Sequence, residues 1–95
     1  MNKLNFVKKL ALSYGADDLY PSNRKHKKYT VLYNGKKIHF GDDNYMDFLD
    51  HGDDKRKMQY LARATNIRNK EGKLTYLDKN SPNFWSVFTL WNEQM

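Results

Sequence analysis

The sequence contains no cysteine, which excludes disulfide bonds and thiolate metal sites and is typical of a reducing compartment. It also contains no apolar run that approaches the roughly 18 residues of a membrane-spanning helix, so we expect no membrane partner. The first 15 residues are basic and partly apolar, but Lys8 and Lys9 interrupt the apolar part. We therefore expect no secretory signal peptide there.

Several signatures of catalysis are absent as well. The sequence has no phosphate-binding loop, no His-Glu-x-x-His pair and no cysteine nucleophile, so we expect no enzyme, no cofactor and no small-molecule substrate. Six aspartates with His39 and His51 nearby are candidates for a hard cation, but their spacing lacks the glycine that a calcium loop needs at its sixth position. We predict no metal site and expect these acids to cap turns and helices or to pair with Arg56 or Arg63.

What is present suits one small domain that spans residues 1–95. The chain has 95 residues, near the lower end for a domain that folds without a metal or disulfide. Aromatic residues make up 15% of it, and each of them can bury a large area. A compact core is therefore expected although only 39% of the residues are apolar.

The clearest local pattern is a β-hairpin over about 29–40. Asn34-Gly35 stands between two segments rich in β-branched and aromatic residues, and this dipeptide favours a type I′ turn. A lone hairpin is only marginally stable, so helices must pack on it. The segment before it, residues 16–28, is predicted to be a loop around Pro21.

Three helices are predicted around this hairpin. An N-terminal helix over residues 3–14 would bury Val7 and Ala11. A central helix over about 53–64 would begin at an aspartate cap and turn Met58 and Leu61 toward the core. A C-terminal helix over about 82–92 would begin at Ser81-Pro82 and bury a stripe of Phe84, Val87, Phe88 and Trp91, with Trp85 and Leu90 beside it. The fold class is therefore α+β, with a possible short strand at 74–77.

Charge is arranged in blocks. Residues 24–37 hold six Lys or Arg and no acid, residues 40–54 hold six Asp and no Lys or Arg, and residues 55–73 hold seven Lys or Arg and one Glu. The acidic block can fold back on a basic one, or the two can form poles that contact oppositely charged neighbours. Alternatively, all these charges are solvated.

The motif order resembles that of a family of small basic proteins encoded by large double-stranded DNA viruses and some tailed phages. The similarity runs from residue 29 to 91 and rests on Gly35–Gly41 (GKKIHFG), Tyr45, Asp47, Asp53, Arg56, Tyr60-Leu61, Arg63, Ser81-Pro82, Trp85-Ser86 and Leu90-Trp91. Ala64 and Val87 depart from it, because relatives often have His at the first position and Arg or Lys at the second. The resemblance implies a viral origin and no catalytic assignment.

Two functions fit these observations. The first is a virus-encoded structural or virion-associated protein, such as a minor capsid or cement-like component, whose partners are other virion proteins. It would be found in the virion, and in the host cytoplasm or nucleus during assembly. The alternative is nonspecific nucleic-acid binding, with Tyr29 and Tyr33 as stacking faces. In either case the candidate binding residues are Arg24, Lys25, Lys27, Lys28, Lys36, Lys37, Lys55, Arg56 and Arg63.

Overall fold

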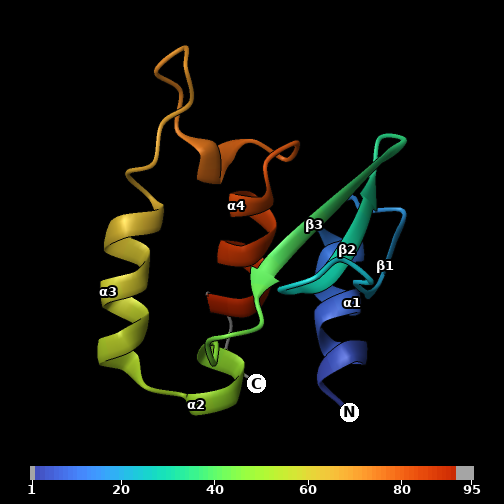
Figure 1. The fold of residues 1–95 in the computed structure, drawn as a ribbon, viewed down its shortest axis with the longest axis horizontal. Coiled ribbons are helices and arrows are strands. Elements are labelled where there is room, and N and C mark those ends of the chain that lie inside the picture. The colour runs from blue at the N-terminus through green and yellow to red at the C-terminus, as the bar shows by residue number, and fades with distance from the viewer. Residues whose placement is uncertain (1, 92–95) are drawn as a thin grey trace.

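The computed structural model in Figure 1 describes residues 2–91. An antiparallel sheet and several helices form one core, so the predicted α+β class is confirmed. The elements in chain order are α1 (Lys3–Ser13), β1 (Asp18–Pro21), β2 (Lys27–Tyr33), β3 (Lys36–Asp42), α2 (Phe48–His51), α3 (Asp54–Ala64), the 3-10 turn η1 (Thr75–Leu77), α4 (Pro82–Trp85) and the π-helix η2 (Ser86–Trp91). α4 and η2 are continuous, and we call them together the C-terminal helix. Residue 92, the last one of the predicted helix, lies outside the described residues.

The predicted hairpin is confirmed as β2 and β3. Asn34 and Gly35 both have positive φ, 51° and 76°, as a type I′ turn requires. The sheet has a third strand that the sequence did not predict, because β1 pairs with β2 on the other side. β1 has only four residues and ends at Pro21, which an edge strand accepts because one row of its N–H groups stays unpaired.

The core lies on one face of this sheet. Leu19, Val31 and Ile38 are aligned across the three strands and are buried. α1 and the C-terminal helix contact each other and this face (Figure 1), and Val7 and Ala11 are buried as predicted. Residues between these positions point to the opposite face, which the helices leave uncovered.

The C-terminal helix differs from the prediction in the side chains that it buries. Trp85 and Leu90 were placed beside the buried stripe, yet their exposed fractions are 0% and 1%. Phe84 and Val87 are buried as predicted. The helix is buried on more than one face because it contacts β3, α1 and α3. Ser81 caps this helix and Pro82 occupies its first turn, as predicted.

The prediction for α3 was correct in position and wrong in orientation. Asp53 caps the helix and accepts from the N–H groups of its first turn. Met58 was expected in the core but is 72% exposed, whereas Ala64 is 3% exposed and Tyr60 is half-buried. α3 packs mainly on η2 and α2, and its Tyr60 face is turned toward them. The short strand predicted at 74–77 is also wrong, because Leu74 forms only an isolated bridge and η1 follows it.

Candidate functional site

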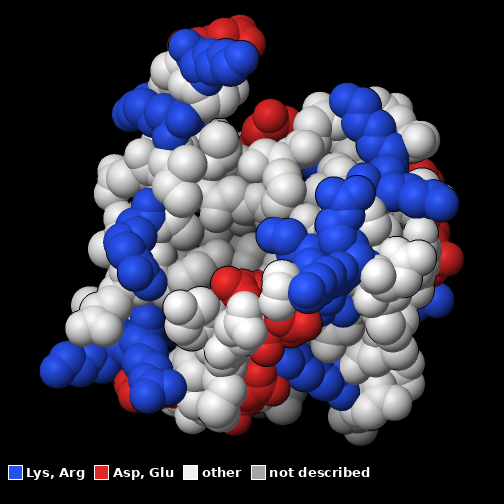
Figure 2. All heavy atoms as spheres, in the orientation of Figure 1, with Lys and Arg blue, Asp and Glu red and all other residues white. Residues whose placement is uncertain are grey.

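A cleft of about 730 Å³ separates α3 from the sheet. Figure 2 shows the hollow, with Lys and Arg side chains gathered over α3 on one side and over the hairpin on the other. The side chains on α3 recur at helical spacing and continue one turn beyond its end: Arg56, Gln59, Tyr60, Arg63 and Ile67. The opposite wall, from β2 and β3, contains Lys27, Lys28, Phe40, Gly41 and Asp42. The C-terminal helix forms the floor with Asn83, Ser86, Leu90 and Trp91. One end is closed by Tyr45, Met46, Asp47 and His51.

The charges of the cleft are mainly positive. Four cations and two aspartates line it, a net charge of +2. Within the described residues, Lys27 and Arg63 form no ion pair, and the Nε of Arg56 lies 3.7 Å from Asp53 at an exposed position. Such exposed pairs are weak, so these cations remain available to an anionic ligand.

Aromatic rings form the floor and hold α3 in place. The rings of Tyr60 and Trp91 are stacked with centroids 4.1 Å apart and planes at 11°. The hydroxyl of Tyr60 is 2.8 Å from that of Ser86, and burial raises the pKa of Tyr60. The ring centroids of His51 and Trp91 are 5.3 Å apart, with the planes tilted at 59°. The cleft therefore combines an aromatic stack between α3 and its floor with cations on its walls.

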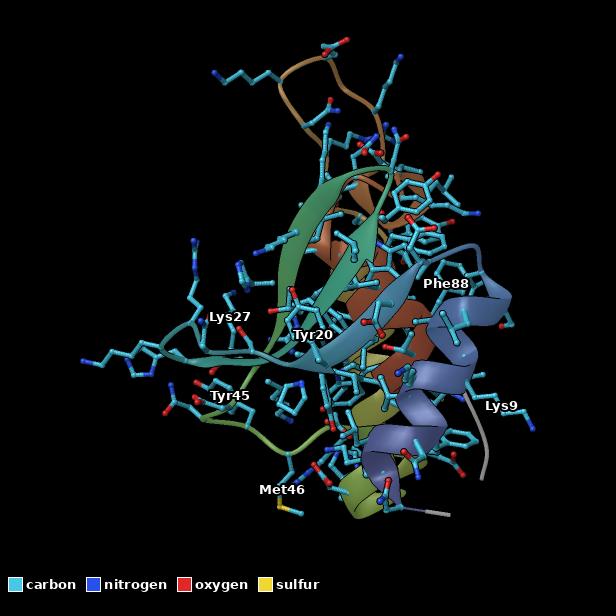
Figure 3. All side chains as sticks on the ribbon, turned by 90° about the vertical axis from the view of Figure 1, so that its right-hand side faces the viewer. Lys9, Tyr20, Lys27, Tyr45, Met46 and Phe88 are labelled. Carbon is cyan, nitrogen blue, oxygen red and sulfur yellow. The ribbon has the colours of Figure 1, made fainter. Side chains whose placement is uncertain are left out.

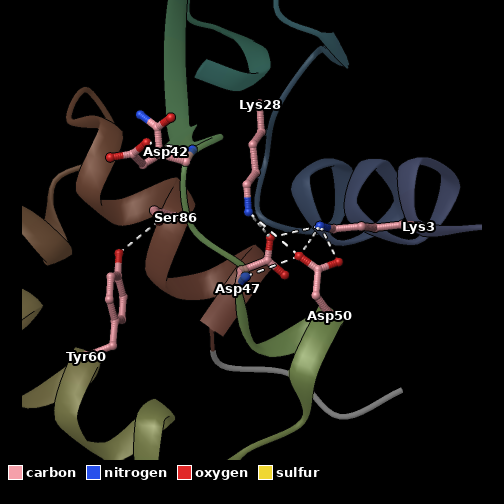
Figure 4. A network of polar contacts seen from close by, with 8 residues as sticks. Lys3, Lys28, Asp42, Asp47, Asp50, Tyr60 and Ser86 are labelled. Atoms are coloured by element: carbon pink, nitrogen blue, oxygen red, sulfur yellow. Dashed lines mark hydrogen bonds and ion pairs between the residues drawn. The ribbon is translucent and has the colours of Figure 1, made fainter. Parts of the chain in front are cut away.

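A cluster of two lysines and two aspartates fixes the end of the cleft (Figure 4). The Nζ atoms of Lys3 and Lys28 both lie 2.8 Å from Oδ2 of Asp47, which is 2% exposed. Lys3 also binds Asp50 at 2.9 Å, and Asp50 accepts from the backbone N–H of Asp47. The cluster ties α1, β2 and α2 together, so the acidic block does fold back on basic residues.

The pKa values in this cluster reflect its ion pairs. Burial alone would lower the pKa of Lys3, but its hydrogen bonds to Asp47 and Asp50 outweigh this and raise it above 10.5. Burial would likewise raise the pKa of Asp50, yet the hydrogen bonds from Lys3 and from the backbone of Asp47 lower it below 3.8. Both groups are therefore charged at neutral pH.

A glycine makes this cluster possible. Gly41 lies opposite Lys28 with φ of +81°, and a Cβ there would lie 3.1 Å from Lys28 Cβ and from Leu90 Cδ1. The lysine stem therefore crosses the backbone at a position that only glycine leaves open.

The structure divides the predicted binding residues into three groups. Lys27, Arg56 and Arg63 line the cleft. Lys28 also borders it, but its ammonium group is bound by Asp47 and its side chain is only 14% exposed. The remaining residues do not line the cleft: Arg24 and Lys25 lie in the loop between β1 and β2, Lys36 and Lys37 at the start of β3, and Lys55 on α3.

Neither of the two predicted stacking residues, Tyr29 and Tyr33, lines the cleft. Tyr29 is buried and packs on Phe40, and Tyr33 packs on Trp85. The exposed aromatic residue at the cleft is Tyr45, at 70%. In Figure 3, Tyr45 lies on the same side of the molecule as Lys27, whereas Lys9 points to the opposite side. The only sequence signal for Tyr45 was an aromatic residue in a polar segment of turn formers.

The acidic segment otherwise acts as expected of turn and cap residues. Asp42 accepts from the N–H of Asn44, and Asp53 caps α3 and lies near Arg56. Among the described residues, no three His, Asp or Glu side chains are grouped as a metal ion would require. Over the same part of the chain, no helix has the length and apolar character to cross a lipid bilayer.

Residues 18–64 match a family described only as a family of unknown function (DUF5754). The match spans β1 to α3. It therefore includes the hairpin, the α3 wall of the cleft, and three members of the cluster, Lys28, Asp47 and Asp50. No curated protein and no solved structure matches the chain.

Proposed function

We propose that the protein binds single-stranded nucleic acid in the cleft, without sequence preference. The observation that supports this is one hollow with an aromatic and apolar interior and cations on both walls. Proteins that bind single strands use this combination, because the cations follow the phosphates while bases stack on aromatic rings.

The aromatic interior favours a single strand over a duplex. A duplex keeps its bases stacked inside and presents phosphates, so Tyr45 and the floor would have no role in binding it. The volume of about 730 Å³ is typical of pockets that hold a small molecule. A cleft of this size has room for unpaired bases. The chain shows no base-reading motif, which favours binding through stacking and charge.

The charge contribution is tested by removing the three available cations of the cleft. The cleft variant carries Lys27→Gln, Arg56→Gln and Arg63→Gln. The matched control carries Lys9→Gln, Lys70→Gln and Lys73→Gln, three exposed lysines that form no ion pair within the described residues. Binding is measured as fluorescence anisotropy of a labelled oligo(dT) of about 12 nucleotides, at several salt concentrations.

We expect the cleft variant to bind at least about tenfold more weakly and to lose about 2 from the slope of log K against log salt, since each phosphate contact to a single strand contributes about 0.7. The control should keep most of its affinity. Equal losses in the two variants would mean that only net charge matters, and the cleft would not be the binding site.

Stacking is tested separately at Tyr45. Tyr45→Ala should weaken oligo(dT) binding by about 1–3 kcal/mol, or roughly 5- to 150-fold in Kd. Tyr45→Phe keeps the ring and should bind like the unchanged protein. Duplex binding should respond little to either change. If duplex is bound as tightly as oligo(dT) and Tyr45→Ala affects neither, the single-strand proposal is wrong.

The structural or virion-associated role is a second proposal. Met58 and Leu77 favour it, because they expose 72% and 61% of their surfaces and exposed apolar side chains are frequent at protein contacts. Asp47 and Asp50, however, bind lysines of the chain itself, which leaves less of the acidic block for a neighbour. Mass spectrometry of purified virions tests this role, since a structural component must be present in stoichiometric amount.

A further inference from the structure

The uncovered face of the sheet carries a second group of functional side chains, centred on His39. In the sheet register Thr30 lies directly opposite His39, and Tyr20 lies on the other side of Thr30. Thr30 Oγ1 is 2.7 Å from Nδ1 of His39, and Ser22 Oγ, from the loop after β1, is 3.0 Å from the same atom. Two hydroxyl groups thus hold one nitrogen of the imidazole.

The hydrogen bonds occupy one ring nitrogen of His39. Ser22 Oγ and Thr30 Oγ1 both lie at Nδ1, and Ser22 Oγ also accepts from the backbone N–H of Arg24 at 3.0 Å. When a hydroxyl donates to Nδ1, the proton of the neutral ring is on Nε2, and we take this tautomer as part of the proposed site. Within the described residues Nε2 has no hydrogen-bond partner. In that tautomer Nε2 is an N–H donor, and the contacts at Nδ1 hold the half-buried ring in place.

Three cations lie near His39. Lys37 is two residues before it on β3, so both side chains are on the same face. The backbone of Arg24 binds Ser22 Oγ, and Lys27 begins β2. Partial burial and the charges of Arg24, Lys37 and Lys27 lower the pKa of His39, so the ring is neutral at pH 7. None of the three cations forms an ion pair within the described residues. The nearest acid in the register is Asp42, which lies opposite Lys27. Like charges grouped without acids are stabilised when an anion binds among them.

We propose that His39 Nε2, Arg24, Lys27 and Lys37 form a binding site for a phosphate group. Two features suit a phosphate oxyanion: a neutral N–H donor that needs no counter-ion, and cations from a loop and from two adjacent strands. Lys27 belongs both to this site and to the cleft, so a strand with a base in the cleft can place a phosphate at His39. Binding of a strand phosphate at His39 therefore rests on the proposed function, whereas binding of free phosphate there is independent of it.

The site is tested by NMR of the ¹⁵N-labelled protein, with the ring nitrogens of His39 as probe. The two ligands are inorganic phosphate and oligo(dT). The site variant carries Arg24→Gln and Lys37→Gln, both at exposed positions, and leaves His39 and its hydroxyl partners in place. The control carries Lys25→Gln and Lys36→Gln, two exposed neighbours with the same total charge change that do not contribute to the pKa of His39.

We expect phosphate to shift the His39 Nε2 resonance saturably in the unchanged protein and in the control, and to raise the pKa of His39. In the site variant, phosphate affinity should fall about tenfold or more, and the pKa of free His39 should rise because two cations are gone. An unchanged His39 resonance, or equal affinity in the site variant and the control, overturns the proposal.

A variant with only Arg56→Gln and Arg63→Gln separates this site from the proposed function. If the unchanged protein binds phosphate at His39 but does not bind oligo(dT), the site holds and single-strand binding is wrong. If oligo(dT) binds and depends on Arg56 and Arg63, while phosphate and oligo(dT) leave His39 unchanged, single-strand binding holds and the phosphate site is wrong.

Discussion

Replacing Asp47 with Asn should destabilise the protein more than any other single charge removal on the acidic segment. Its Oδ2 binds Lys3 and Lys28, each at 2.8 Å, and the side chain is 2% exposed. Removing one partner of a fully buried pair costs about 3–5 kcal/mol. Here Lys3 keeps Asp50 at 2.9 Å and Lys28 has Asp50 at 3.7 Å, so a loss of about 3 kcal/mol is expected rather than the upper value.

The measurement is urea unfolding together with thermal melting. For a domain of this size, about 3 kcal/mol corresponds to a decrease in Tm of about 15 °C. Asp43→Asn is the matched control, because Asp43 is exposed and has only His26 at 3.7 Å; it should change stability by less than about 0.5 kcal/mol. If Asp47→Asn falls within that same range, the cluster does not stabilise the fold and our reasoning is refuted.

The same variant also tests how the cluster affects the cleft. Asp47→Asn removes one negative charge from the cleft and so makes its net charge more positive. Simple electrostatics therefore predicts tighter binding of oligo(dT). We expect weaker binding, because the cluster fixes the segment that carries Tyr45. A double-mutant cycle with Lys28→Met isolates the pair, and the double variant should lose less stability than the sum of the single variants. Strict additivity would show that Lys28 and Asp47 do not interact.

Three further outcomes follow from the structure. The pKa of Asp50 is lowered, so its stabilisation is present above its ordinary pKa of 3.8 and is lost as pH falls through the lower folded value; Asp50→Asn should flatten the acid side of a pH–stability curve. The pKa of Lys3 is raised, so its contribution is full below 10.5 and is lost as pH rises through the higher folded value; Lys3→Met should flatten the alkaline side. Gly41→Ala should cost about 2–3 kcal/mol in urea unfolding, because a Cβ would crowd two neighbours at positive φ, whereas Gly35→Ala, with nothing within 4 Å, should cost only about 1 kcal/mol.

Local chemistry explains why some elements could be predicted from the sequence. Asn34-Gly35, Asp53 and Ser81-Pro82 act through their own backbone and nearest neighbours, so no distant contact is needed to place a turn or a helix start there. β1 could not be predicted from its local sequence. Its four residues include Asp18 and Pro21, and both residue types are unfavourable in strands. The segment forms a strand because it pairs with β2.

The faces of the helices depend on packing partners that are distant in the sequence. α3 has two candidate apolar faces, and the one with Met58 has the stronger helical pattern. The stack of Tyr60 on Trp91 at 4.1 Å selects the other face, and that contact joins residues 31 positions apart. The C-terminal helix contacts β3, α1 and α3, and a single apolar stripe in the sequence does not show that more than one face is buried, which is why Trp85 and Leu90 were misplaced.

The charge blocks allowed only part of the candidate site to be predicted from the sequence. Lys27 and Lys28 are indistinguishable by composition and both belong to the predicted binding set. The ion pair with Asp47 separates them: Lys28 crosses Gly41 to reach Asp47, whereas Lys27 lines the cleft and has no ion pair within the described residues. Part of the acidic block thus neutralises Lys3 and Lys28 inside the fold. Among residues 2–91, Lys27 and Arg63 have no ion pair, and they lie at the cleft, where a polyanion can reach them.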